Sequence, residues 1–361
     1  MSINFLKNSA FCALPFISRF QDTSGEQHLC CYSRSQVDYS NRSQIQQLRS
    51  DLLSGKKIDH CQSCYLVEEQ GAISPRLKES ARWLRDPEVR NYISSWSETS
   101  EEKVWFYDLR YDNKCNLACI MCGPRNSTLW QRELNQTISK SAVPWSQEQV
   151  LRAKKIYMAG GEPLIIDSFI ELLQEIAKID QQPEVVINTN LTSLSEDVQS
   201  TLSKLHQLTL TVSVDAYGAV NEYHRWPLKW EKFVRNLEWA RSIKCSILFN
   251  TVVDAVSILG IPKLIEIESF ADYWDLDILT DPLELSVINL PDSVKSKVKL
   301  DWKNLEKSKF YQTDVVFRSR VNTVLAMLDK FGDPDKLSNY IDSIDKRRNL
   351  DHTKFLGIKL T

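Results

Sequence analysis

The chain has 361 residues with 42% hydrophobic and 25% charged side chains, which fits one large folded domain or two to three smaller ones and argues against long disorder. The net charge is −2 without a lysine or arginine run, so nothing marks a nucleic-acid footprint. No apolar stretch approaches a membrane span, and the first residues lack a signal-peptide pattern. We therefore expect a cytoplasmic protein, in which disulfides are rare and nine cysteines indicate metal binding.

Hydrophobic periodicity predicts alternating strands and helices from residue 103 onward. The expected strands cover 103–110, 154–158, 184–188, 208–214 and 245–253, with a last one within 276–288. The expected helices cover 126–134, 166–177, 194–205, 229–241 and 262–270. This alternation indicates an α/β fold with a parallel sheet and crossover helices, either doubly wound or an open partial barrel.

Polar side chains share one face of two expected strands. Thr211, Ser213 and Asp215 lie on one face of their strand, and Asn188 and Asn190 share a face of the preceding one. Because a strand buried on both faces is normally apolar, these residues indicate a cavity that holds something polar. The alternative is that they are strand-end residues with ordinary hydrogen bonds.

Three cysteines follow the first of these strands, in the segment CNLACIMC: Cys115, Cys119 and Cys122, the core cysteines. A closed zinc site or a structural [4Fe–4S] cluster has four protein ligands. Three ligands leave one iron open, and the loop starts at the carboxyl end of a strand, where open α/β sheets place their sites. A zinc site with one remote ligand is the alternative, but zinc does not explain the motif GGEP after the next strand.

Together, in this order, the two motifs resemble the radical SAM superfamily over roughly residues 100–290. The resemblance implies a partial (β/α)6 barrel in which the core cysteines hold a [4Fe–4S] cluster and S-adenosylmethionine (SAM) binds the fourth iron. It implies a set of SAM-binding residues: Gly160, Gly161, Glu162, Pro163, Asn188, Asn190, Ser213, Asp215, Arg225 and Met121. Glu162 would accept hydrogen bonds from the SAM ammonium group. Met121 stands where the family usually has an aromatic residue near the adenine, which is a departure from the pattern.

A second cysteine group lies near the N-terminus, where Cys12, Gly25 and Cys30 give C-x12-G-x4-C and Cys61 and Cys64 give C-x-x-C. This pattern resembles the SPASM or twitch auxiliary-cluster module, which commonly follows the radical SAM core rather than preceding it. The resemblance implies a second [4Fe–4S] cluster held by the four N-terminal cysteines: Cys12, Cys30, Cys61 and Cys64. Cys31 could replace its neighbour Cys30, and a structural zinc site is the competing interpretation.

Two further features have ordinary structural interpretations. Cys245, on the fifth expected strand, is interpreted as a buried inert thiol that faces outward. The aromatic stretch at 223–230 is expected to pack a loop onto a helix, and the alternative is that it lines a substrate pocket. His224 has no neighbouring residue in the sequence at metal-ligand spacing, so we do not expect it to bind a metal.

These interpretations give three expected regions: an auxiliary-cluster module at 1–98, the radical SAM partial barrel at 99–290 and a helical C-terminal extension at 291–361. The family implies an enzyme that cleaves SAM reductively to a 5′-deoxyadenosyl radical, which takes hydrogen from a peptide or small-molecule substrate. The implied electron source is a one-electron reductant such as flavodoxin or ferredoxin. The alternative function is a non-catalytic iron–sulfur or SAM-binding scaffold.

Overall fold

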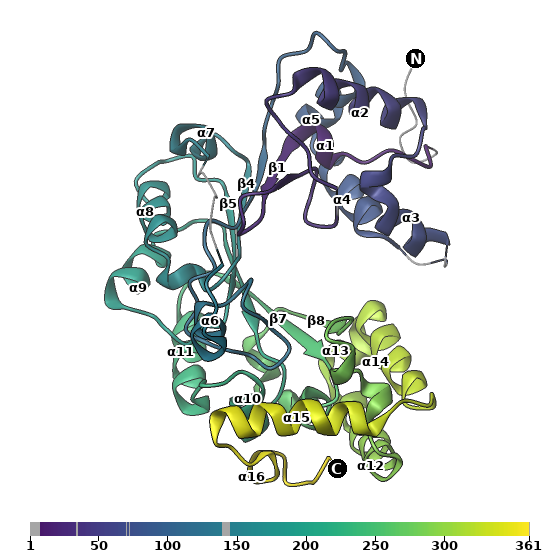
Figure 1. Cartoon of the computed structure of the whole chain (residues 1–361). Helices are drawn as coiled ribbons and strands as arrows, with labels where there is room; N and C mark the ends of the chain where they lie inside the picture. Colours follow the sequence, from purple (N-terminus) through teal and green to yellow (C-terminus); the bar gives the residue numbers. More distant parts are fainter. Residues whose placement is uncertain (1–7, 34, 70, 72, 139–144, 361) are drawn as a thin grey trace. The chain divides into compact units, whose positions relative to one another are not determined.

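The computed structural model describes residues 8–33, 35–69, 71, 73–138 and 145–360. The chain divides into two compact units (Figure 1). The first unit comprises residues 1–112, 139–160 and 179–185, and the second comprises 113–138, 161–178 and 186–361. The predicted region boundaries at 98/99 and 290/291 stay predictions.

The strands form an open sheet in the order β2-β1-β3-β4-β5-β6-β7-β8. Their bounds are β1 (Ser18–Gln21), β2 (Gln27–His28), β3 (Phe106–Leu109), β4 (Lys155–Met158), β5 (Glu184–Thr189), β6 (Leu208–Ser213), β7 (Ser246–Val253) and β8 (Tyr273–Ile278). β1 pairs with β3 in parallel and with β2 in antiparallel, and the β3–β4, β6–β7 and β7–β8 pairs are parallel. The expected α/β class with a partial, unclosed barrel is confirmed.

The first unit packs short helices around an apolar core. Its helices are α1 (Leu14–Ile17), α2 (Arg42–Ser54), α3 (Gln62–Glu69), α4 (Pro75–Trp83), α5 (Pro87–Ser94) and α7 (Gln147–Leu151), with a 3-10 turn at Asp59–Cys61. Phe16, Leu52 and Val89 are completely buried in this core. β1 was not predicted, because all four of its residues are buried although three are polar, which leaves no alternating pattern. One of them, Arg19, pairs with Glu102 and so keeps its charge partnered inside the unit.

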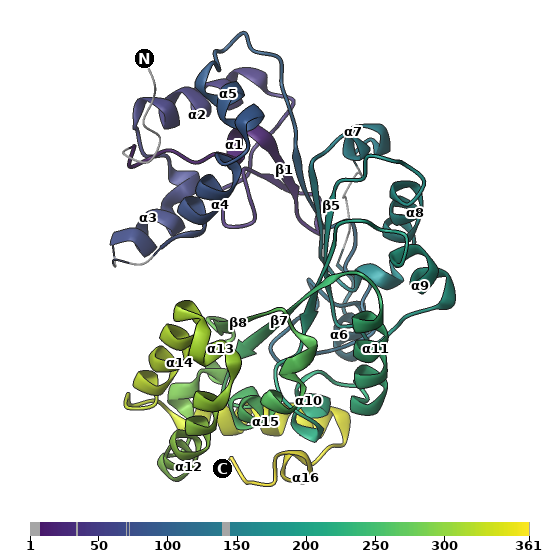
Figure 2. The same cartoon turned by 180° about the vertical axis from the view of Figure 1, so that it is seen from behind.

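The second unit carries the remaining helices: α6 (Thr128–Leu134), α8 (Asp167–Ile176), α9 (Glu196–Leu202), α10 (Ala219–His224), α11 (Trp230–Ser242), α12 (Asp292–Trp302), α13 (Lys309–Thr313), α14 (Val315–Met327), α15 (Pro334–Arg348) and α16 (His352–Leu356). Short 3-10 turns lie at Pro163–Ile165, Ser257–Leu259, Leu283–Leu285, Val287–Asn289 and Lys303–Lys307. Trp274 of β8 packs against Phe317 of α14 with the rings tilted and their centroids 5.0 Å apart. Figures 1 and 2 both show α15 running beside α10. The mainly helical character expected beyond residue 291 is therefore present.

Two predicted elements differ from the structure. The last strand is Tyr273–Ile278, so the expected range 276–288 was placed too late. The two aspartates of this strand are exposed, and their polar character obscures the apolar signal of the buried Trp274 and Leu276 in the sequence. The segment Ile261–Phe270 forms a 3-10 helix and not the expected α-helix. Pro262 and the β-branched isoleucines in that segment lower its α-helical propensity.

In the part of the chain that the structure describes, no helix has both the length and the apolar character needed to cross a membrane.

Candidate active site

The loop that carries the core cysteines is anchored to the start of α6. Ser127 caps this helix, accepting from the backbone N–H groups of Leu129 and Trp130, and donates its hydroxyl to the carbonyl of Leu117 at 2.6 Å. Thr128 accepts a hydrogen bond from the Cys115 backbone N–H at 3.2 Å. The first turn of α6 therefore holds the cysteine loop at two points, Cys115 and Leu117.

The three core cysteines lie close to one another, with Cys119 buried and the other two half-buried. Burial raises the pKa of Cys115, and the neighbouring thiols of Cys119 and Cys122 raise it further. Burial also raises the pKa of Cys119 to about 12, although Arg225 acts in the opposite direction. If all three thiols were ionised, their negative charges would repel one another. A cationic group that binds all three as thiolates would remove this repulsion.

The GGEP turn lies directly against this loop. A Cβ at Gly161 would come within 2.2 Å of the Lys114 carbonyl oxygen, so only glycine permits this approach. The next residue, Glu162, donates its backbone N–H to the same oxygen at 2.8 Å. The second unit therefore contains a cradle in which the backbone at 161–162 meets the base of the cysteine loop.

The side chain of Glu162 is buried and bonded to three donors. Oε1 accepts from Thr189 Oγ1 at 2.7 Å and from the Leu164 backbone N–H at 3.1 Å, and Oε2 accepts from the Asn190 backbone N–H at 2.6 Å. Burial raises the pKa of Glu162 to about 7 in spite of these donors. An ionised carboxylate offers about four lone-pair positions, so one remains for a further donor.

Asn190 connects this carboxylate to the cysteine loop. Its Nδ2 donates to Asn116 Oδ1 at 3.0 Å and lies 3.9 Å from the Cys115 sulfur. On the neighbouring strands, Ser213 donates to Asn188 Oδ1 at 3.3 Å, as expected for residues that share one face. The structure thus brings together Asn188 and Ser213, one residue from each of the two predicted polar faces.

Asp215, His224, Arg225 and Asp254 form a buried charged network beside the core cysteines. Asp215 Oδ2 lies 2.6 Å from Arg225 Nε and 3.0 Å from His224 Nδ1, while His224 Nε2 lies 2.5 Å from Asp254 Oδ2. Burial would raise the pKa of Asp215, but Arg225 and His224 outweigh it and lower that pKa to about 2. Burial likewise opposes the charge of His224, yet Asp254 and Asp215 raise its pKa to about 9.

This network reaches the cysteine loop through Arg225, whose Nη1 lies 3.8 Å from the Cys119 sulfur. Asp215 was predicted to contact SAM, but Arg225, His224 and the Val252 backbone N–H, at 2.8 Å, already engage its carboxylate. Its visible task is to orient Arg225. The sequence analysis missed Asp254, which lies 39 positions after Asp215 with no local motif.

The remaining predicted core residues have simpler settings. Pro163 is buried at the start of the 3-10 turn after Glu162, and Met121 is half-buried in the cysteine loop. Cys245 immediately precedes β7 instead of lying within it, and its thiol is close to the Ala240 carbonyl at 3.3 Å.

The four N-terminal cysteines also gather, within the first unit. The charges of Cys61, Cys30 and Cys64 all act on Cys12, and burial raises the pKa of Cys61 to about 11. Cys30 is coupled to Cys61 and Cys64, whereas Cys31 lies beside Asp108 and Arg110. These neighbours favour Cys30 over Cys31 as the member of this group.

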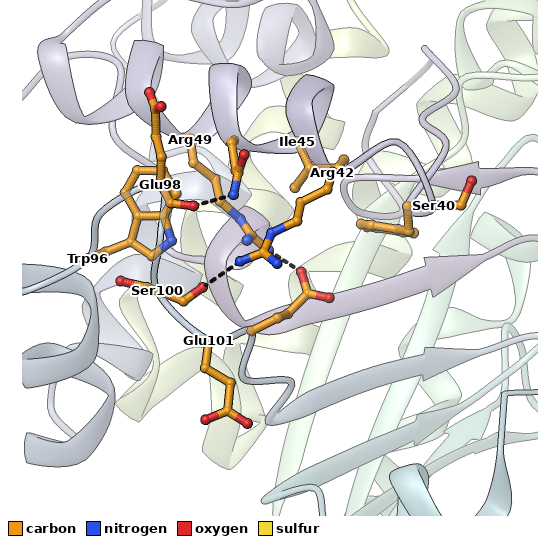
Figure 3. A pocket seen from close by; sticks show the side chains of 11 residues that line it. Ser40, Arg42, Ile45, Arg49, Trp96, Glu98, Ser100 and Glu101 are labelled. Carbon is orange, nitrogen blue, oxygen red and sulfur yellow. Dashed lines mark hydrogen bonds and ion pairs between the residues drawn. The ribbon is translucent and has the colours of Figure 1, made fainter.

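Figure 3 shows a separate pocket of about 340 Å³ in the first unit, between α2 and the segment around Trp96. Its arginines are used within the protein: Arg49 Nη2 bonds Glu102 at 2.9 Å, and Arg42 Nη2 bonds the Ser100 carbonyl at 3.3 Å. None of the predicted site residues lines this pocket.

Comparison with known proteins gives sequence relatives and structural neighbours. GTP 3′,8-cyclase of Synechocystis sp. is 25% identical over 169 residues, which cover 46% of this chain and 50% of that protein. GTP 3′,8-cyclase of Clostridium botulinum is 26% identical over 121 residues, 32% of this chain and 36% of that protein. The chain thus spans half the length, or less, of these relatives.

Among solved structures, Streptococcus suis SuiB bound to S-adenosylmethionine aligns with a TM-score of 0.43 and 12% identity, covering 72% of this chain and 62% of that one. SuiB bound to the precursor peptide SuiA aligns with a TM-score of 0.41 and 14% identity, covering 69% of this chain and 59% of that one.

The family comparison falls on the segment that holds the cysteine loop, the GGEP turn and the charged network. The match covers residues 111–261, inside the range of roughly 100–290 expected from the two motifs. Over these residues the chain matches the model of the Radical SAM superfamily.

Proposed function

We propose that this chain is an enzyme that cleaves SAM reductively and uses the resulting 5′-deoxyadenosyl radical to take a hydrogen atom from a bound substrate. The observation that carries the proposal is that one unit holds three neighbouring cysteines, a GGEP turn packed against their loop, and a buried carboxylate that Asn190 links to Cys115. One electron from a flavodoxin- or ferredoxin-type donor splits SAM into methionine and the radical. The radical then becomes 5′-deoxyadenosine by accepting the substrate hydrogen.

The residues fit the cofactors that the superfamily uses. The core cysteines would hold a [4Fe–4S] cluster, which supplies the electron and leaves one iron for SAM. The Arg225 guanidinium, 3.8 Å from the Cys119 sulfur, would offset the negative charge of the thiolates. Asp215 and His224 hold Arg225 in place, so we assign Asp215 a positioning role in addition to the SAM contact implied by the family.

SAM binding is assigned to the cradle and the polar strand ends. The superfamily resemblance assigns the methionine end to the GGEP turn, Gly160 to Pro163, and Glu162 has a lone-pair position free for the ammonium group. Asn188 and Ser213 would face the ribose. Met121 would pack against the adenine with a flexible apolar side chain.

The four N-terminal cysteines are assigned to an auxiliary [4Fe–4S] cluster in a twitch-type module. Sulfur ligands on one tetrahedral zinc, with Zn–S near 2.3 Å, lie roughly 3.8 Å apart. Among the residues described, three potential ligand atoms come within 4.8 Å of one another only at Asp22, Glu26 and His28. The core cysteine motif in the same chain supports a cluster over a single zinc ion. Full ligation would give this cluster an electron-transfer or pocket-shaping role.

The substrate is assigned only by class, as a peptide or small molecule. The relatives named GTP 3′,8-cyclase match half their length or less, so their substrate is not transferred to this chain. The mixed surface charge, with a net value of −2, gives no reason to prefer nucleic acid.

Detection of 5′-deoxyadenosine tests the proposal. The anaerobically reconstituted protein, with SAM and dithionite, should release it, and a variant with all three core cysteines changed to Ala should not. If the intact cluster-loaded protein binds SAM without ever releasing 5′-deoxyadenosine, the chain is instead a non-catalytic iron–sulfur scaffold.

A further inference from the structure

Three successive carbonyl groups of the cysteine loop are each bonded to a side chain. The Ala118 carbonyl accepts from Arg348 Nη2 at 2.7 Å, and the Ile120 carbonyl accepts from Tyr340 Oη at 2.7 Å. Between them, the Cys119 carbonyl accepts from Trp130 Nε1 at 2.8 Å. Two of the three donors therefore belong to α15, more than 200 positions later in the sequence.

The backbone N–H groups of the same loop are bonded on the other side. Ala118 donates to the Trp226 carbonyl at 2.7 Å, and Ile120 donates to the His224 carbonyl at 2.9 Å. Because buried backbone groups need partners, this pattern holds the loop in one conformation. A carbonyl oxygen bonded in this way cannot turn toward the thiolates, whose negative charge it would oppose.

The helix that supplies these donors is itself firmly packed. Leu337, Ile341 and Ile344 recur at helical spacing and are buried. Tyr223 of α10 donates to Asp345 at 2.8 Å, which fixes the later turns of α15. Figures 1 and 2 show the two helices side by side.

Arg348 has more than one partner at the loop. Its Nε lies 3.1 Å from Glu133 Oε2, and its guanidinium stacks 4.8 Å from the centre of the Trp130 ring. Its Nη1 is buried and has no hydrogen-bond partner among the residues that the structure describes. Because its Nη2 bonds the carbonyl of Ala118, the residue before Cys119, this cation lies beside the thiolate-bearing part of the loop.

We infer that α15 is a positioning element for the SAM-binding cluster: Tyr340 and Arg348 hold the cysteine loop in its ligating conformation, and Arg348 adds positive charge beside it. The inference rests on the proposed function, because it requires a cluster at the core cysteines. Neither side chain needs to touch SAM or substrate. Their action passes through the backbone of the loop and through the electrostatic field at Cys119.

Tyr340→Phe tests the positioning role, with Tyr223→Phe as its matched control. Both changes remove one hydroxyl that contributes to the packing of α15, but only the first removes a donor to the loop. The readout is the rate at which a ferrous chelator removes the loop cluster, followed through the SAM-dependent change in the EPR spectrum of the reduced protein. Partners outside the ligand shell change metal affinity by about 10–100-fold, so Tyr340→Phe should lose the cluster about tenfold faster. Tyr223→Phe should match the unaltered protein.

Arg348→Met and Arg348→Lys test the charge through the midpoint potential of the same cluster. Arg348→Met should lower the potential, and Arg348→Lys, which keeps the charge and one donor, should restore most of it. If Arg348→Met fails to fold, the comparison of Tyr340→Phe with Tyr223→Phe still decides the positioning role, because each tyrosine variant removes only one hydroxyl. Equal cluster loss in both tyrosine variants, or an unchanged potential in Arg348→Met, would overturn the inference. Absence of any SAM-dependent change in the unaltered protein would instead count against the proposed function.

Discussion

Replacing Glu162 with glutamine should destabilise the protein as well as weaken SAM binding. Each carboxylate oxygen of Glu162 accepts from a backbone N–H, one from Leu164 and the other from Asn190. A glutamine amide has only one oxygen, so in either orientation its NH2 group meets a backbone N–H donor. Glu162→Gln therefore leaves one buried donor unpaired, whichever way the amide turns.

The size of both effects follows from this geometry. A buried unpaired donor costs about 1–3 kcal/mol, which should lower the urea midpoint of the ligand-free protein measurably. A charge-assisted hydrogen bond contributes about 1.5–3 kcal/mol, so SAM affinity should fall roughly ten- to hundredfold. Urea unfolding followed by circular dichroism measures the first effect. Calorimetric titration of the cluster-loaded protein with SAM measures the second.

Thr189→Val provides the control, because it removes the hydroxyl donor to Oε1 and leaves the carboxylate charge and both backbone N–H contacts in place. The change also removes the acceptor of the Leu191 backbone N–H, so it should cost about 1–3 kcal/mol in stability and change SAM affinity less than Glu162→Gln does. A Glu162→Gln variant as stable as the unaltered protein would refute the three-donor geometry. Lost stability with unaltered SAM affinity would refute the role of Glu162 in binding the ammonium group.

Three other predictions test the remaining parts of the site. Because the pKa of His224 is raised to about 9 in the folded protein from its ordinary 6.5, the stabilisation it provides is fully present below pH 6.5 and lost as the pH rises through 9; urea unfolding should show this slope, and His224→Gln should flatten it. Anaerobically reconstituted protein should contain about eight iron and eight sulfide, and the triple Ala variant of the core cysteines about half; zinc found in place of the remaining iron would contradict the auxiliary cluster. The double variant Cys61→Ala, Cys64→Ala, if folded, should still release 5′-deoxyadenosine but lose substrate conversion. Normal product formation by this variant would show that the N-terminal cysteines have a structural role only.

The alternating core was predictable because local patterns encode it. The strands that became β3 to β7 were expected within a few residues of their bounds, since apolar residues and turn signals mark each one. β1 was missed for the opposite reason: Ser18, Arg19 and Gln21 are buried, and their partners lie far away in the sequence. A polar strand inserted beside β3 leaves no periodic signal.

The site divides in the same way. The core cysteines and the GGEP turn are short motifs, and side-chain alternation along the strands was enough to pair Asn188 with Ser213. Tyr340 and Arg348 could not be found, because nothing in their helix marks the two side chains that bond a loop more than 200 residues earlier. The choice between Cys30 and Cys31 also needed the fold, since adjacent residues have equal standing in a spacing pattern.

The bonds between α15 and the cysteine loop also have a consequence for the order of events during synthesis. The loop leaves the ribosome early, whereas Tyr340 and Arg348 follow 220 and 230 positions after the carbonyls that they bond. At about 5–20 residues per second, that separation corresponds to roughly 10–45 seconds of translation. Throughout this interval the nascent loop has the Trp130 donor but neither donor from α15. The loop can therefore reach its final conformation only after translation has passed Arg348, which places stable cluster insertion late in the life of the nascent chain.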